Sequence, residues 1–120
     1  MKEIISTVAV IVDASYPAET FKILFKESRS AYDSSTQSET IAFNAYKVVD
    51  DTEGEYEIIG DHKRVIDKTT LDAIRASLTV NANPVTEYCD YRNEELIKGI
   101  AYVINADGIY GLTTAQLTLR

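Results

Sequence analysis

Two apolar segments near the start of the chain are separated by a loop that is too short for a parallel connection. Residues 3–13 are rich in β-branched side chains, and residues 21–26 alternate Phe, Ile and Phe with Lys, Leu and Lys, which is the pattern of a strand in each case. A parallel crossover needs about a dozen residues and usually a helix, and the stretch between Val12 and Phe21 cannot supply them. The two strands are therefore predicted to form an antiparallel hairpin.

Further strand patterns follow in the first half of the chain. Residues 40–49 alternate well, and short strands are expected at 56–59 and 64–66, joined through Gly60 and Asp61. Residues 50–57 contain five carboxylates and are predicted to form an acidic turn. Their spacing does not match a calcium-binding EF-hand loop.

Helical spacing appears after residue 67. Thr69 or Thr70 is expected to cap a first helix, whose apolar stripe is Leu71, Ile74 and Leu78. Asn93 is expected to cap a second helix, with a stripe formed by Leu96, Ile97, Ile100, Val103 and Ile104. Residues 105–108 (NADG) should end this helix, and residues 112–119 are predicted to form a closing strand.

This order of elements predicts one α+β domain over residues 1–120, with a mainly antiparallel sheet and two helices packed on one face. The closing strand is expected to pair with the first or second strand. A chain of 120 residues can bury a core without disulfides.

Residues 28–38 are predicted to form a long exposed loop. The stretch is rich in Ser, has no Gly or Pro, and contains only Ala31 and Tyr32 as apolar residues. Long loops in compact domains are usually functional or mobile. Two alternatives follow: a mobile hairpin tip, or an arm that becomes ordered against a neighbouring subunit with Tyr32 as its anchor.

The chain is acidic, with a formal net charge of -7. Binding to a nucleic-acid backbone needs clustered Lys and Arg, and the longest basic cluster is Lys63-Arg64. We therefore expect no direct nucleic-acid partner, whereas a cationic protein partner is compatible with the charge.

Neither a membrane nor a signal-peptide secretion route is expected. No apolar run reaches the ~18 to 20 residues that span a bilayer, and the N-terminal sequence has no small-residue cleavage site after its apolar stretch. The expected location is the cytoplasm or an assembled particle such as a virion.

Asp13 is the first candidate for catalysis, because it ends the first strand as strand-tip aspartates do in phosphatase-like and von Willebrand A-like sites. Those sites occur in parallel sheets, and Pro17 stands where the A-domain motif requires an oxygen ligand. The simpler interpretation is that Asp13 starts a turn by accepting a hydrogen bond from the backbone two residues later.

The remaining sequence offers no specific catalytic motif. The single His62 is expected in a hairpin turn, and acidic neighbours would raise rather than lower the pKa of the single Cys89 thiol. The five glycines do not form a phosphate-binding loop. We expect no enzyme activity, no cofactor and no metal. A hydrolase or metal enzyme centred on Asp13, His62, Cys89 and Asp90 is the weakest of three hypotheses.

Tyrosine is unusually frequent, with eight Tyr against three Phe and no Trp. Tyrosines at the ends of elements suit protein interfaces, although they can also complete the edge of a small core. The candidate interface residues are Tyr16, Arg29, Tyr32, Tyr88, Tyr91 and Tyr110.

The first hypothesis for function is a non-enzymatic structural or assembly subunit that forms homo- or hetero-oligomers. In general style, over its whole length, the chain is similar to the small tail, neck or connector proteins of bacteriophage virions, which are often compact α+β domains with one projecting loop. This similarity rests on no motif. The alternative is a small acidic regulatory or inhibitor module that uses the carboxylates of residues 50–57 against a basic partner.

Overall fold

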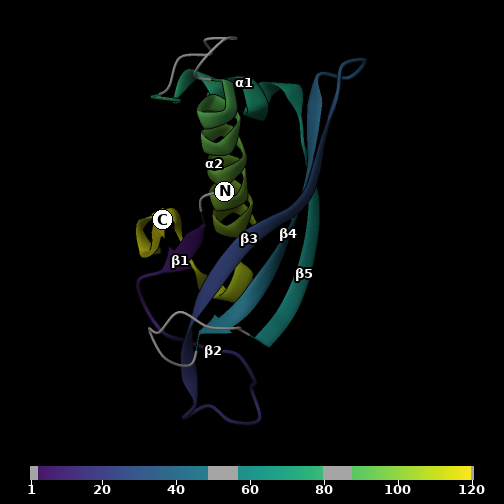
Figure 1. Ribbon diagram of the computed structural model, residues 1–120. Coiled ribbons are helices and arrows are strands. Elements are labelled where there is room, and N and C mark those ends of the chain that lie inside the picture. The colour runs from purple at the N-terminus through teal and green to yellow at the C-terminus, as the bar shows by residue number, and fades with distance from the viewer. Residues whose placement is uncertain (1–2, 49–56, 80–87, 120) are drawn as a thin grey trace.

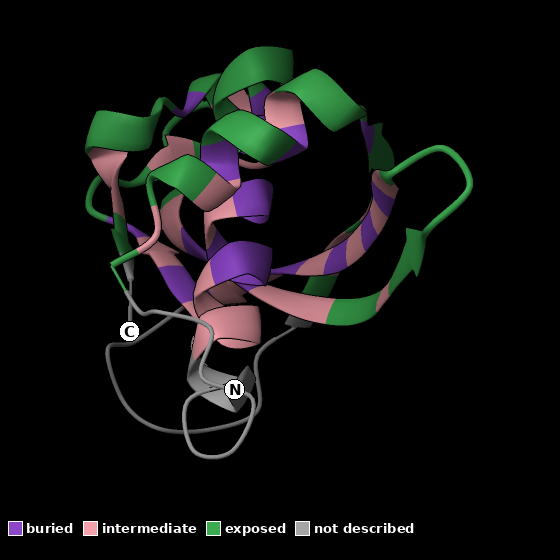
Figure 2. Cartoon of the chain, turned by 90° about the horizontal axis from the view of Figure 1, so that it is seen from above, coloured by how far each residue is buried: buried purple, intermediate pink, exposed green. Residues whose placement is uncertain are grey.

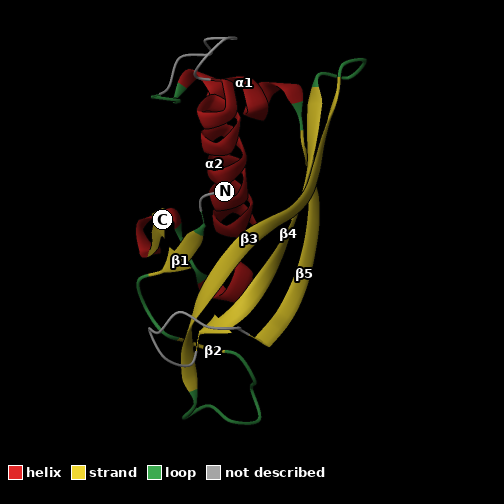
Figure 3. Ribbon diagram, in the orientation of Figure 1, coloured by secondary structure: helices red, strands yellow, loops and turns green. Residues whose placement is uncertain are grey.

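The computed structural model describes residues 3–48, 57–79 and 88–119, and it shows an antiparallel sheet with helices on one face (Figures 1 and 3). The predicted α+β class is confirmed. In chain order the elements are β1 (Ile4–Ser6), β2 (Val10–Ile11), β3 (Thr20–Asp33), β4 (Ser38–Val48), β5 (Glu57–Ile66), α1 (Lys68–Ala76), α2 (Tyr88–Asp107), the 3-10 turns η1 (Ile109–Gly111) and η2 (Thr114–Gln116), and β6 (Leu117–Leu119).

The strand order is β5-β4-β3-β1-β6, with β2 paired beside β1 on β3, and each of these pairings is antiparallel. This confirms the predicted hairpin between the first two strand segments, and the closing strand does pair with the first. The segment 3–13 is nevertheless interrupted. The Ser6 hydroxyl donates to the Val8 carbonyl at 2.7 Å and accepts from the Ile23 amide at 2.9 Å, which breaks the strand between β1 and β2.

The prediction of a long loop over 28–38 is wrong for most of that segment. β3 runs to Asp33 and β4 begins at Ser38, and the ladder between them continues to the pair Asp33–Ser38. The connection is a short turn, in which Asp33 Oδ1 accepts from the Ser35 amide at 2.9 Å. The outer part of β3, residues 28–33, carries polar residues because most of it is exposed, so an alternation of apolar residues is not needed there.

Two short strands were expected where the structure has the single strand β5. Gly60 and Asp61 lie within it, opposite Ala45 and Asn44 of β4. The register shifts beside them, so that Ile59 is an extra residue in the strand, a β-bulge. The predicted acidic turn lies almost entirely outside the described residues.

The helices begin elsewhere than predicted. Asp67, not Thr69 or Thr70, caps α1, and its Oδ1 accepts from the Thr70 amide at 2.9 Å. α2 begins at Tyr88, so Asn93 lies inside it. The end of α2 agrees with the prediction, because Gly108 follows it with a φ of 61°. The closing strand is shorter than predicted, since 3-10 turns occupy most of 109–116.

The core lies between the sheet and α2, whose predicted apolar stripe is buried in full (Figure 2). Gly99 permits this approach, because a Cβ at this position would lie 2.3 Å from Cδ1 of Ile41 on β4. In the described part of the chain, no helix has the length and hydrophobicity needed to cross a membrane.

Candidate interaction surface

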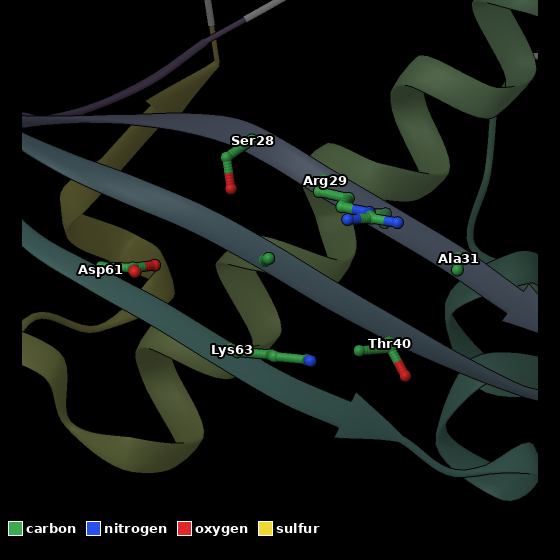
Figure 4. Close-up of a pocket in the computed structure, with 8 residues that line it drawn as sticks. Ser28, Arg29, Ala31, Thr40, Asp61 and Lys63 are labelled. Carbon is green, nitrogen blue, oxygen red and sulfur yellow. The ribbon is translucent and has the colours of Figure 1, made fainter.

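Among the described residues, the sheet has one face without a helix, and a hollow lies on this face. Residues of β4 alternate between buried positions on the helix side and half-buried positions on the opposite side. The open side presents Thr40, Ala42 and Asn44, which are small or polar. A hollow of about 600 Å³ lies over this part of β3, β4 and β5 (Figure 4).

Strand register places two cations on opposite sides of the hollow. Arg29 of β3 pairs with Ala42 of β4, and Ala42 pairs with Lys63 of β5. The three residues therefore share a row across the sheet, with the alanine between the two cations. Ser28 is the extra residue of a bulge next to Arg29, and Asp61 is two residues before Lys63 on the same face. The hollow exists because the middle strand contributes only small side chains to its floor.

Arg29 and Lys63 differ from the other described Lys and Arg residues in their interaction partners. Lys22 and Lys47 have interaction partners, and the remaining described Lys and Arg residues form ion pairs, namely Lys26, Arg64, Lys68, Arg75, Arg92 and Lys98. Within residues 3–48, 57–79 and 88–119, Arg29 and Lys63 have no such partner. Among the described residues, the lining of the hollow therefore holds two cations without an ion pair, together with one carboxylate, Asp61.

Exposed apolar side chains lie on the same face of β5, on either side of Lys63. Val65 is 68% exposed and lies opposite Thr40, and Ile58 is 59% exposed and lies opposite Tyr46. Burying a side chain of this size is worth about 1.5–3 kcal/mol. A partner that covered this face would bury these apolar side chains and could also form ion pairs with Arg29 and Lys63.

Buried ion pairs fasten the outer part of the β3–β4 hairpin to the helices. Glu39 is 0% exposed and accepts from Arg92 of α2, which also donates to Glu95. Arg75 of α1 donates to Glu95 at 2.7 Å and stacks over Tyr32 at 4.9 Å. We call this group the hairpin clamp. It holds the hairpin, and with it the open face, in one position against α1 and α2.

The electrostatics of the clamp favour the charged form of its two arginines. Burial opposes the charge of Arg92, but hydrogen bonds and charges from Glu39 and Glu95 outweigh it and raise its pKa above the usual value. The pKa of Arg75 is raised in the same way, against its own desolvation, chiefly by Glu95. Both guanidinium groups therefore remain charged. The other carboxylate oxygen of Glu39, Oε2, is buried without a hydrogen-bond partner among the described residues.

The structure places the six predicted interface residues in several locations. Arg29 lines the hollow, and Tyr32 and Tyr91 lie together beside the clamp, around a pocket of about 200 Å³. Tyr16 is exposed in the loop between β2 and β3, and Tyr88 is the first residue of α2. Tyr110 is half-buried and packs against His62 and Phe25. They do not form one surface.

His62 is not in a turn but on the helix side of β5, where it stacks on Phe43 with ring centroids 5.3 Å apart. Its Nε2 is buried without a hydrogen-bond partner in the described structure. Desolvation, assisted by the charge of Arg64, lowers the pKa of His62 below 6.5. Burial raises the pKa of the neighbouring Tyr110. The lowered pKa favours the neutral ring, which packs against Phe43 and Tyr110.

The residues of the enzyme hypothesis are not brought together. Asp13 starts a turn and accepts from the Ser15 amide at 2.9 Å, as expected. His62 packs against Tyr110 just after the end of α2, whereas Cys89 and Asp90 are in its first turn. Because a helix of 20 residues is about 30 Å long, His62 lies near one end of α2, far from Cys89 and Asp90 at the other end. Among the described residues, no group of three or more His, Cys, Asp or Glu could hold a metal ion.

Lys63, Glu39 and Arg92 are the important residues that sequence reasoning missed. Lys63 was noted only as part of a basic pair, because its position opposite Ala42 depends on strand register. Treating 28–38 as a strand would have placed Arg29 and Ala31 on one face and Ser30 and Tyr32 on the other.

Comparisons of the chain with protein families, with curated proteins and with solved structures find no match.

Proposed function

We propose that this chain is a non-enzymatic structural subunit that assembles with further copies of itself through the uncovered face of its sheet, in the manner of a tail, neck or connector component of a bacteriophage virion. The observation that carries the proposal is the hollow with two unpaired cations, flanked on β5 by exposed Val65 and Ile58. Unpaired charge and exposed apolar area on one face are what a protein contact uses.

The hairpin clamp supports the same function. A subunit of an assembly needs a contact surface that keeps its shape, because ordering a mobile segment upon binding costs free energy. The buried pairs of Glu39 and Glu95 with Arg92 hold the long β3–β4 hairpin against α2. The open face is thus organised before a partner arrives.

The molar mass of the untagged chain, measured by light scattering over about a hundredfold dilution, tests this function. We expect a defined oligomer that dissociates on dilution. Hydrogen exchange in the same samples should show added protection in the strands around the hollow, residues 28–31 and 61–65, when the oligomer forms.

A chain that remains monomeric at every concentration would contradict the proposal. It would favour the second candidate, a regulatory module that binds a basic protein through the carboxylates of residues 50–57. The sequence feature behind that candidate is the presence of five acids and no Lys, Arg or His in this segment. A complex with a basic protein that dissociates in high salt would support it.

A further inference from the structure

The hollow on the open face is suited to an anionic segment of protein. Arg29 and Lys63 lie on the two sides of Ala42, separated by two strand spacings, or about 10 Å between backbones. Carboxylates that enter between them can pair with both without displacing an ion pair of the described residues, and Asp61 is the one acid in the lining. The floor of Ala31, Thr40 and Ala42 leaves room for such a segment.

The chain itself contains a segment of the required charge. Residues 50–57, in the connection between β4 and β5, include Asp50, Asp51, Glu53, Glu55 and Glu57 and contain no cation. This is the densest group of acids in the sequence. Except for Glu57, these residues lie outside the described structure, and they connect Val48 at the end of β4 to the start of β5.

Chain length favours a hollow on a neighbouring molecule. Val48, the last residue of β4, is six residues from Ala42, which corresponds to about 20 Å along the strand. A connection of eight residues, tethered at Val48 and Glu57, can extend about four residues outward, or about 13 Å of backbone. The backbone of the segment therefore stops about 7 Å short of the Arg29–Ala42–Lys63 row of its own molecule, level with Asn44 and Asp61 at the near edge of the hollow.

We propose that the Asp50–Glu57 segment of one copy binds in the Arg29–Lys63 hollow of the next copy. This inference rests on the proposed function and names its contact. The hollow and the segment are different parts of the chain, so the interface is heterologous. Contacts of this kind repeat from one copy to the next and produce closed rings or open filaments.

Two complementary variants test the contact. The hollow variant carries Arg29→Gln and Lys63→Gln, and the segment variant carries Asp50→Asn, Asp51→Asn, Glu53→Gln and Glu55→Gln. Each should self-associate about tenfold more weakly than the wild type, or not at all. When mixed in equal amounts they should form a dimer of one copy each, because each retains the half of the contact that the other has lost.

A matched control carries Thr69→Glu and Ala73→Glu on the exposed side of α1, which changes the net charge by the same two units as the hollow variant. It should assemble as the wild type does. Molar masses come from light scattering, and circular dichroism establishes that every variant is folded.

Three results would overturn the inference. If the folded hollow variant keeps the wild-type mass, the hollow does not make the contact, and assembly through the open face would depend on Val65 and Ile58 alone. If the mixture of folded variants stays monomeric, or if the charge control also dissociates, the hollow and the segment do not recognise each other. If the wild type itself is monomeric, the proposed function fails and this inference fails with it.

Discussion

Gly99 sets the distance between α2 and the sheet. A Cβ there would lie 2.3 Å from Cδ1 of Ile41 and 3.2 Å from Cδ1 of Ile66. Gly99→Ala gains about 1 kcal/mol of helix propensity, but overpacking costs about 1–3 kcal/mol. We expect a net loss of about 1 kcal/mol in the free energy of unfolding, measured by urea denaturation.

A double-mutant cycle checks the cause of that loss. Ile41→Val removes Cδ1, the atom closest to the new methyl group. The double variant should lose less stability than the sum of the two single variants, with a coupling of about 0.5 kcal/mol or more. Simple additivity would show that the predicted contact does not form.

His62 gives the fold a dependence on pH with a definite sign. Its folded pKa is lowered from 6.5 by desolvation and by Arg64. The unfolded chain therefore takes up a proton near pH 6.5, whereas the folded chain does so only at a lower pH. This contribution to stability is present above pH 6.5 and is lost as the pH falls toward the folded pKa.

His62→Phe should reduce the loss of stability just below pH 6.5, because the substitution removes the proton uptake while keeping a ring against Phe43. Urea denaturation of both proteins above and below pH 6.5 measures the difference. Equal slopes of stability against pH in the two proteins would contradict this role of His62.

At the scale of the elements, the hairpin clamp is the contact that holds the outer half of β3 and β4. Glu39→Gln removes the buried negative charge that pairs with Arg92, and breaking a buried ion pair costs about 3–5 kcal/mol. We expect a loss of about 3 kcal/mol and faster hydrogen exchange in residues 30–41. Asp72→Asn, in the exposed pair with Lys68, is the matched control and should leave the denaturation midpoint nearly unchanged. Similar losses in the two variants would show that the clamp adds nothing beyond a surface pair.

The elements that the sequence predicted well are those buried on one side. The stripe from Leu96 to Ile104 in α2 and the alternation of β4 both reflect contact with the core, and such contact imposes a period on the sequence. The outer part of β3 was missed because most of it is exposed, so nothing required apolar residues there. The helix starts were missed because several residues near each start can serve as caps.

The candidate site was harder to predict than the fold. Arg29 was identified, but its partner across the hollow, Lys63, is 34 positions away in the sequence, and only the register of two strand pairs brings them into one row. The clamp also joins distant residues, since Glu39 and Arg92 are 53 positions apart. No local sequence pattern predicts a contact between residues so far apart in the chain.

At the scale of the whole molecule, the described helices cover one side of the sheet and leave the other side without a helix (Figures 1 and 2). The molecule is elongated, with extents of 46 × 27 × 23 Å, because the β3–β4 hairpin continues past the short strands β1 and β6. One long open face on each copy is a suitable shape for a subunit of a ring or tube.

The most direct test of this account compares the molar masses of three chains by light scattering. Val65→Glu changes the open face, where Val65 is 68% exposed, and Tyr102→Glu changes the helix side, where Tyr102 is 44% exposed. We expect the wild type and the Tyr102 variant to form the same oligomer and the Val65 variant to shift toward the monomer. An oligomer that survives in the Val65 variant but dissociates in the Tyr102 variant would contradict assembly through the open face of the sheet.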